Sequence, residues 1–307
     1  MNISVTGVNG FVGKHLAREL KRRGYRVIGL GREPAPAVEI KASLDDYWVC
    51  DLLDTTALSK LKFNKIDKII NLAGLAKVGD SFSNEDQYLK VNVGVLANLC
   101  QLLVDRSFRP RIIAVSSSAV YDPNQPMPLT EESKTTGENS PYAKSKHLME
   151  EVAERYRKLG LDIVTVRPFN HTGPGQEPGF LIPDLHKNIM TANSSGAPLK
   201  TGNLATRREY TDVRDVVEAY VQLATKPRLK HNLYNICRGE SVAGRTILEL
   251  LIRHLNLPDI KVTTDPALLR PNDIPDLFGS YDRLHTETGW QPKISIKKTI
   301  KDFIESA

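Results

Sequence analysis

The sequence has little cysteine, with only Cys50, Cys100 and Cys237 among its 307 residues. These three are scattered and form no CxxC pair, so neither a zinc site nor a disulfide framework is expected. Free cysteines are typical of a reducing compartment, and we therefore predict a cytoplasmic protein with no metal.

Long apolar runs are also lacking. No stretch approaches the roughly 18 apolar residues that a membrane span requires. The chain begins directly with a strand pattern, without the charged and apolar regions of a signal peptide. We therefore expect no membrane segment and no targeting signal.

Clusters of one charge are absent, although the formal net charge is +6. Lysine and arginine are interspersed with acidic residues, which argues against a nucleic-acid surface and is compatible with an anionic diphosphate ligand. There is no internal repeat and no low-complexity tail. The length allows one large α/β domain with an appended lobe, or two domains.

Residues 6–13 form the strongest motif, a glycine-rich loop between a short apolar strand (1–5) and a helical pattern (14–23). Glycines let such a loop turn tightly and approach a pyrophosphate, whose charge is favoured at a helix N-terminus. The alternative is a plain strand-to-helix turn. The cofactor contacts predicted here are Gly7, Asn9, Gly10, Phe11, Val12 and Gly13.

The second strand, residues 26–30, ends in Gly31 and Arg32 without an acidic residue at either position. A strand-end carboxylate binds the ribose hydroxyls of NAD, whereas an arginine can hold the 2′-phosphate of NADP. Arg32 therefore favours NADP(H), unless it faces solvent and NAD is used as well. Prolines indicate that residues 33–46 form a loop.

Further strand ends are expected at the same edge of the sheet. Asp51, after a strand at 48–50, can meet the adenine or can cap the next helix together with Asp54 and Thr55. A fourth strand, predicted at residues 68–74, leads into a small-residue turn, and near Ala73 and Gly74 the cofactor can pass close to the main chain. The helix at 84–105 is apolar on more than one face, as expected between the sheet and a partner subunit.

A serine cluster, residues 116–118, follows a strand at 111–115, and Tyr142 and Lys146 lie four apart on a helix beginning near 141. A nearby ammonium favours the phenolate, so we expect Lys146 to lower the pKa of Tyr142. Such a phenol can exchange a proton with a carbonyl/alcohol pair while a nicotinamide carries the hydride. The alternative is an ordinary exposed helix pair. Lys144 should point elsewhere.

The segments TGVNGFVG, VSSSAVY and YAKSK, in this order, resemble the extended short-chain dehydrogenase/reductases that act on nucleotide sugars. The resemblance covers essentially the whole chain and places the catalytic serine or threonine on Ser117, counted back from Tyr121. Asp122 replaces the family's usual glycine, which puts the local turn in question. Implied cofactor contacts also include Leu52, Leu72, Asn92, Val115, Pro168 and Asn170, besides Tyr142 and Lys146.

The second half, with RPFN, TRREYTDVRDV and LRPNDIP, is similar to the reductases of GDP-4-keto-6-deoxy-mannose, which make GDP-rhamnose-type sugars. In such relatives the positions of Asn170, Arg208 and Arg270 bind the diphosphate, as bidentate guanidinium groups can. Arg208 could instead pair with Glu209 or Asp212. The remaining substrate contacts implied are Ser117, Ser118, Tyr142, Phe180 and Leu181.

Other members of this family differ in identifiable residues. Dehydratases carry an acidic residue after the catalytic threonine, whereas Ser118 and Ala119 follow Ser117 here. Epimerases hold NAD firmly and usually carry an acidic second strand end, which Arg32 does not match. The order of hypotheses is therefore a reductase, then an NAD-dependent nucleotide-sugar 4-epimerase, then a non-catalytic NADP-responsive scaffold.

The fold predicted is a Rossmann-type doubly wound parallel α/β sheet with a smaller α/β lobe. We assign residues 1–168, with a returning segment at about 210–237, to the dinucleotide domain, and 169–209 and 238–307 to the substrate lobe. The resemblance implies a homodimer joined through the helices at about 84–105 and 141–159.

Overall fold

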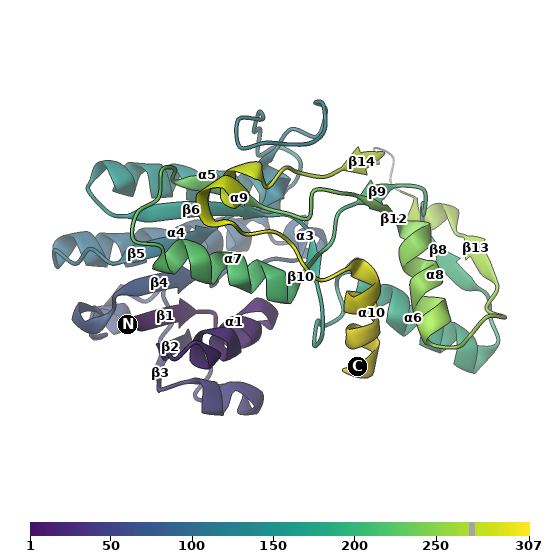
Figure 1. Cartoon of the computed structure of the whole chain (residues 1–307), viewed down its shortest axis with the longest axis horizontal. Helices are drawn as coiled ribbons and strands as arrows, with labels where there is room; N and C mark the ends of the chain where they lie inside the picture. The colour runs from purple at the N-terminus through teal and green to yellow at the C-terminus, as the bar shows by residue number, and fades with distance from the viewer. Residues whose placement is uncertain (270–273) are drawn as a thin grey trace.

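The computed structural model describes residues 1–269 and 274–307, and its central element is a seven-stranded parallel sheet (Figure 1). The order β11-β6-β5-β4-β1-β2-β3 reverses between β4 and β1, which is the switch point of a doubly wound sheet. The predicted fold class is thus confirmed. The strands are β1 (Asn2–Thr6), β2 (Arg26–Gly31), β3 (Asp46–Val49), β4 (Lys68–Asn71), β5 (Arg111–Val115), β6 (Ile163–Pro168) and β11 (Leu233–Ile236).

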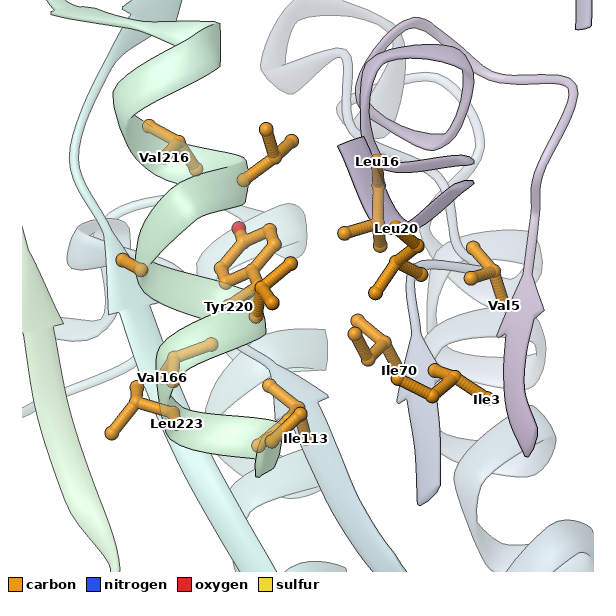
Figure 2. Close-up of a cluster of buried hydrophobic side chains, with 14 of the residues drawn as sticks. Ile3, Val5, Leu16, Leu20, Ile70, Ile113, Val166, Val216, Tyr220 and Leu223 are labelled. Carbon is orange, nitrogen blue, oxygen red and sulfur yellow. The ribbon is translucent and has the colours of Figure 1, made fainter. Parts of the chain in front are cut away.

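Helices cover both faces of this sheet, which explains why its central strands are buried along nearly their whole length. On one face, Tyr220 and Leu223 pack with Leu16 and Leu20 over the strands, as Figure 2 shows. The other face packs against two long helices through residues such as Leu99. The helices are α1 (Phe11–Arg22) and α7 (Val213–Thr225) on the first face, and α2 (Thr55–Leu58), α4 (Glu85–Asp105) and α5 (Pro141–Lys158) on the second.

A smaller lobe with its own core lies beside the sheet (Figure 1). Its helices pack through Ile189, Leu251 and Phe303, among others. Leu284 and Trp290, which the predicted boundaries give to the lobe, instead belong to the core under the large sheet. The lobe's elements are α6 (Leu181–Ser195), α8 (Gly244–His254), α10 (Ile296–Glu305), the pair β8 (Leu199–Thr201) and β13 (Val262–Thr264), and the sheet β12 (Val242–Ala243), β9 (Arg207–Arg208) and β14 (Asp276–Leu277).

Short elements connect these parts: α3 (Val78–Ser81), α9 (Asp282–Thr288), β7 (His171–Thr172) and β10 (Thr211–Asp212). Among the helices of the described chain, none combines the length and the apolarity needed to cross a bilayer. The three cysteines are free and buried.

Two local predictions were wrong. The expected loop at 33–46 contains a 3-10 helix, Val38–Ser43, which is anchored by the buried side chain of Ile40. The third strand runs from Asp46 to Val49 and not from 48 to 50, because pairing with β2 begins where Asp46 faces Ile28. The seventh strand, β11, was not foreseen as a strand.

Glu209 links the lobe to the large sheet. Its carboxylate is fully buried and accepts hydrogen bonds from the backbone N–H groups of Arg238 and Gly279, the latter at 2.6 Å. Burial raises the pKa of Glu209 to about 8, although these donors act in the opposite direction.

This shift predicts a pH-dependent stability. The folded protein holds the Glu209 proton above the ordinary pKa of 4.5, so the contribution is fully present below that value and is lost as pH rises through about 8. In urea unfolding between these limits, Glu209→Gln should flatten the pH slope of the unfolding free energy by up to about 1.4 kcal/mol per pH unit. The exposed Glu240, which pairs with Arg238, supplies the control Glu240→Gln. Parallel slopes for wild type and Glu209→Gln would contradict the prediction.

Candidate active site

The glycine loop lies between β1 and α1, at the switch point of the sheet. Gly7 has a φ of +65°, and a Cβ added to it would lie 3.0 Å from the backbone of Ala73, beyond β4. A Cβ on Gly13 would lie 2.5 Å from the carbonyl oxygen of Gly7. Gly10 is the N-cap of α1 and offers no side chain to its first N–H groups. The loop therefore leaves helix N–H groups open to a pyrophosphate, a fit for a dinucleotide. Phe11 and Val12 begin α1.

The turn after β4 lies directly against the glycine loop. The Thr6 hydroxyl donates to Asn71 Oδ1 at 2.7 Å and accepts from the Ala73 N–H at 3.1 Å. Asn92 of α4 accepts from the Leu75 N–H at 2.7 Å and donates to Ser145 Oγ at 2.8 Å. Leu72 and Gly74 complete the turn, which is thereby held to both α4 and α5.

Beside the glycine loop, the end of β2 carries an exposed Arg32 and the carboxylate of Glu33, which the sequence prediction missed. Asn9 Nδ2 donates to Glu33 Oε2 at 2.9 Å, and Asn9 Oδ1 accepts from the Ala37 N–H at 2.9 Å. Asp51, after β3, is exposed and accepts from the Leu53 N–H at 2.9 Å, while Asp54 caps α2. Leu52 beside Asp51 is buried.

The start of α5 brings the three predicted catalytic residues together. Ser140 caps the helix by accepting from the Ala143 N–H at 3.1 Å, and this fixes Tyr142 in the first turn. The Tyr142 hydroxyl lies beside the Ser117 side chain, and Lys146 Nζ donates to the Val115 carbonyl at 2.9 Å. The tyrosine, the lysine and the end of β5 thus form one buried cluster.

The two serines on either side of Ser117, Ser116 and Ser118, do not belong to this cluster. Ser116 Oγ donates to a carboxylate oxygen of Glu150, and Ser118 is buried in the turn after Ser117. Lys144 forms an ion pair with Glu85 at 2.8 Å and points away from the cluster, as predicted. The Tyr88 ring packs edge-on against Tyr142, with ring centroids 6.3 Å apart.

The expected direction of the Tyr142 pKa shift was wrong for this arrangement. Burial raises the pKa of Tyr142, and the Ser117 side chain opposes this only in part. Lys146 does not reverse the shift, because its ammonium is directed at the Val115 carbonyl. Burial lowers the pKa of Lys146 itself to about 8, against the influence of Glu150. Both side chains are therefore biased toward their neutral forms.

The substrate residues named from the resemblance lie on the lobe side. Phe180 and Leu181, at the start of α6, are 36% and 41% exposed. Asn170 is exposed two residues after Pro168, the end of β6. Arg208 Nη1 donates to the carbonyls of Arg207 and Ile274, each at 2.7 Å.

The alternative partners considered for Arg208 are used elsewhere. Glu209 accepts from backbone N–H groups, and Asp212 pairs with Arg214 at 2.7 Å and caps α7. Asp212 thus orients Arg214. Arg270 lies outside the described residues.

A doubly wound sheet with a glycine loop at its switch point and a serine–tyrosine–lysine cluster at an adjacent strand end defines an NAD(P)-dependent oxidoreductase of the short-chain dehydrogenase/reductase type. Within the described residues, no group of three or more His, Cys, Asp or Glu is arranged to hold a metal ion. Residues 3–237 match the NAD dependent epimerase/dehydratase family, and the chain belongs to that family.

Known proteins similar to this chain include both reductases and epimerases. GDP-6-deoxy-D-mannose reductase of Pseudomonas aeruginosa is 32% identical, over 98% of this chain and 95% of that protein. UDP-glucose 4-epimerase of Yersinia enterocolitica is 26% identical, over 100% of this chain and 96% of that protein. The solved structure of RMD from Pseudomonas aeruginosa complexed with NADPH is 29% identical with a TM-score of 0.83, covering 99% of this chain and 98% of that chain.

Proposed function

We propose that this chain uses NADPH to reduce a nucleotide-diphosphate 4-keto-6-deoxy sugar, most concretely GDP-4-keto-6-deoxy-mannose to GDP-rhamnose. The observation that carries the proposal is the buried cluster in which the Tyr142 hydroxyl lies beside the Ser117 side chain, with Lys146 one turn further along α5. The similarity to a GDP-6-deoxy-D-mannose reductase over nearly the full chain supports the substrate class. The NADPH in a related structure supports the cofactor.

Each residue of the cluster has a part in the reaction. A reduced dinucleotide whose pyrophosphate is held at the glycine loop would supply the hydride from its nicotinamide ring. Tyr142 gives its proton to the substrate oxygen, and the Ser117 hydroxyl donates a hydrogen bond to the same oxygen. Lys146 holds the nicotinamide ribose. Asn170, Arg208 and Arg270 hold the diphosphate.

The surroundings of Ser117 favour reduction over dehydration. Elimination of water needs a carboxylate beside the substrate, and Ser118 and Ala119 follow Ser117. Glu150, the carboxylate nearest in the chain to Lys146, is bound to Arg167 through both of its oxygens. Reduction requires only the proton donor and the cofactor.

We further propose a cytoplasmic homodimer joined through α4 and α5. These two helices pack on each other and carry half-buried apolar side chains, among them Leu89, Val93, Leu148 and Val152. We also propose a division into a dinucleotide domain and a substrate lobe at residues 168, 210 and 237, in which Leu284 and Trp290 of the C-terminal segment pack into the core of the large sheet.

A panel of GDP-, UDP- and dTDP-4-keto-6-deoxy sugars tests the reaction, with the loss of NADPH absorbance as the readout. We expect oxidation of NADPH with at least the GDP sugar, and reduction at C4 in the product. Stoichiometric NAD released from denatured protein, without NADPH oxidation, would favour the 4-epimerase. Cofactor binding without turnover of any sugar would favour a scaffold.

A further inference from the structure

The end of β2 carries a carboxylate that the linear sequence conceals. Gly31 has no side chain, and a Cβ built on it would lie 2.8 Å from Glu33 Oε2 and also in contact with the Tyr47 hydroxyl. Glu33 therefore reaches back two residues and fills the space that a strand-end acidic side chain would occupy. In the folded protein the Glu33 carboxylate therefore lies at the end of β2, although no acidic residue stands at that strand end in the sequence.

This carboxylate is held in place by the glycine loop and by β3. Asn9 Nδ2 donates to Glu33 Oε2 at 2.9 Å, and the Tyr47 hydroxyl donates to the Glu33 carbonyl at 2.9 Å. The backbone N–H groups of Glu33 and Arg32 also contact the carboxylate, and together with Asn9 they lower the pKa of Glu33. The group is therefore ionised at neutral pH, and Glu33 is exposed.

Arg32, the adjacent residue, presents the opposite charge. It is exposed and follows β2 directly. A strand-end carboxylate accepts the ribose 2′-hydroxyl of NAD, whereas a guanidinium pairs with the 2′-phosphate of NADP. The end of β2 thus carries a carboxylate, Glu33, suited to NAD and a guanidinium, Arg32, suited to NADP.

We infer that Glu33 is a specificity residue for the cofactor: its carboxylate binds the ribose 2′-hydroxyl of NAD(H) and repels the 2′-phosphate of NADP(H), which Arg32 attracts. The inference rests on the proposed function only in that a nicotinamide dinucleotide binds at the glycine loop. It implies that the chain binds both cofactors, and that its preference for NADPH is smaller than Arg32 alone would give.

The competing explanation is that Glu33 only fixes the loop at 33–37 through Asn9. A glutamine at this position keeps an oxygen that can accept from Asn9 but removes the negative charge. If the role is structural, Glu33→Gln leaves the two cofactors equally affected. If Glu33 sets specificity, the same change weakens NADH and strengthens NADPH.

The test is isothermal titration of purified protein with NADPH and with NADH, without any sugar. Glu33→Gln should raise the ratio of NADPH to NADH affinity by about tenfold or more, the size expected when a charged hydrogen-bond partner is lost and a like charge is removed. The matched control is Glu39→Gln, which removes a carboxylate from the same segment but one that pairs with Lys14 at 2.6 Å. Its ratio should stay within about twofold of wild type.

An unchanged ratio in Glu33→Gln, or an equal change in Glu39→Gln, would overturn the inference. Because no sugar is present, a wrong sugar assignment leaves the test unaffected. Failure of the wild type to bind either cofactor would instead overturn the proposed function along with the inference.

Discussion

Tyr142→Phe is expected to lower kcat by about three orders of magnitude, because a positioned general acid contributes roughly 10²–10⁴ in rate. Phenylalanine keeps the ring that packs against Tyr88 and loses only the hydroxyl that lies beside Ser117. The Kd for NADPH should therefore stay within about twofold of wild type. Steady-state oxidation of NADPH with the keto sugar gives kcat, and titration of the same preparation gives the Kd.

Tyr88→Phe is the matched control for this substitution. The Tyr88 hydroxyl donates to the Lys77 carbonyl and takes no part in the Ser117 cluster. Its loss should change kcat by no more than a few-fold. If Tyr142→Phe retained a tenth of wild-type turnover or more, the proton would have to come from another group, and the catalytic assignment would fail.

Much of the dinucleotide-binding part of the structure could be predicted from short sequence motifs. The glycine loop stands between a strand and a helix in the sequence, and strand ends meet at one edge of a parallel sheet. Those two facts are enough to bring Ser117 near Tyr142 and Lys146. The Tyr–Lys spacing places both on one helix face, and Ser140–Pro141 mark where that helix begins.

The features that could not be predicted from the sequence depend on tertiary structure. Glu33 was passed over because it follows the strand end by two residues, and only the folded loop returns its carboxylate to Gly31. The Tyr142 pKa moved opposite to expectation because burial is a tertiary quantity that neighbouring residues in the chain do not reveal. Likewise, β11 is a four-residue strand whose place is set by pairing with β6.

A buried ion pair supports the catalytic strand ends and was also not foreseen. Arg167, on β6, donates to Glu150 from Nε at 2.9 Å and from Nη2 at 2.6 Å, and Ser116 adds a third donor to this carboxylate. The two charged side chains are only 7% and 14% exposed. The pair therefore ties β5, β6 and α5 together next to Ser117 and Lys146.

Glu150→Ala is expected to lower the free energy of unfolding by about 3–5 kcal/mol, because it leaves the Arg167 charge buried and uncompensated. Arg167 Nη1 already lacks a hydrogen-bond partner within residues 1–269 and 274–307. Urea unfolding of wild type and variant measures the difference. The control is Glu151→Ala, at a side chain that is 65% exposed and lies 3.7 Å from His147, and it should change stability by less than about 0.5 kcal/mol.

The double variant Glu150→Ala, Arg167→Met separates an uncompensated charge from lost packing. If the buried charge causes the instability, removing Arg167 as well should restore a substantial part of the loss, and the double variant should be more stable than Glu150→Ala. If the two substitutions were simply additive, the pair would stabilise the fold through packing alone. Equal stability of Glu150→Ala and Glu151→Ala would show that the ion pair does not hold these strand ends together.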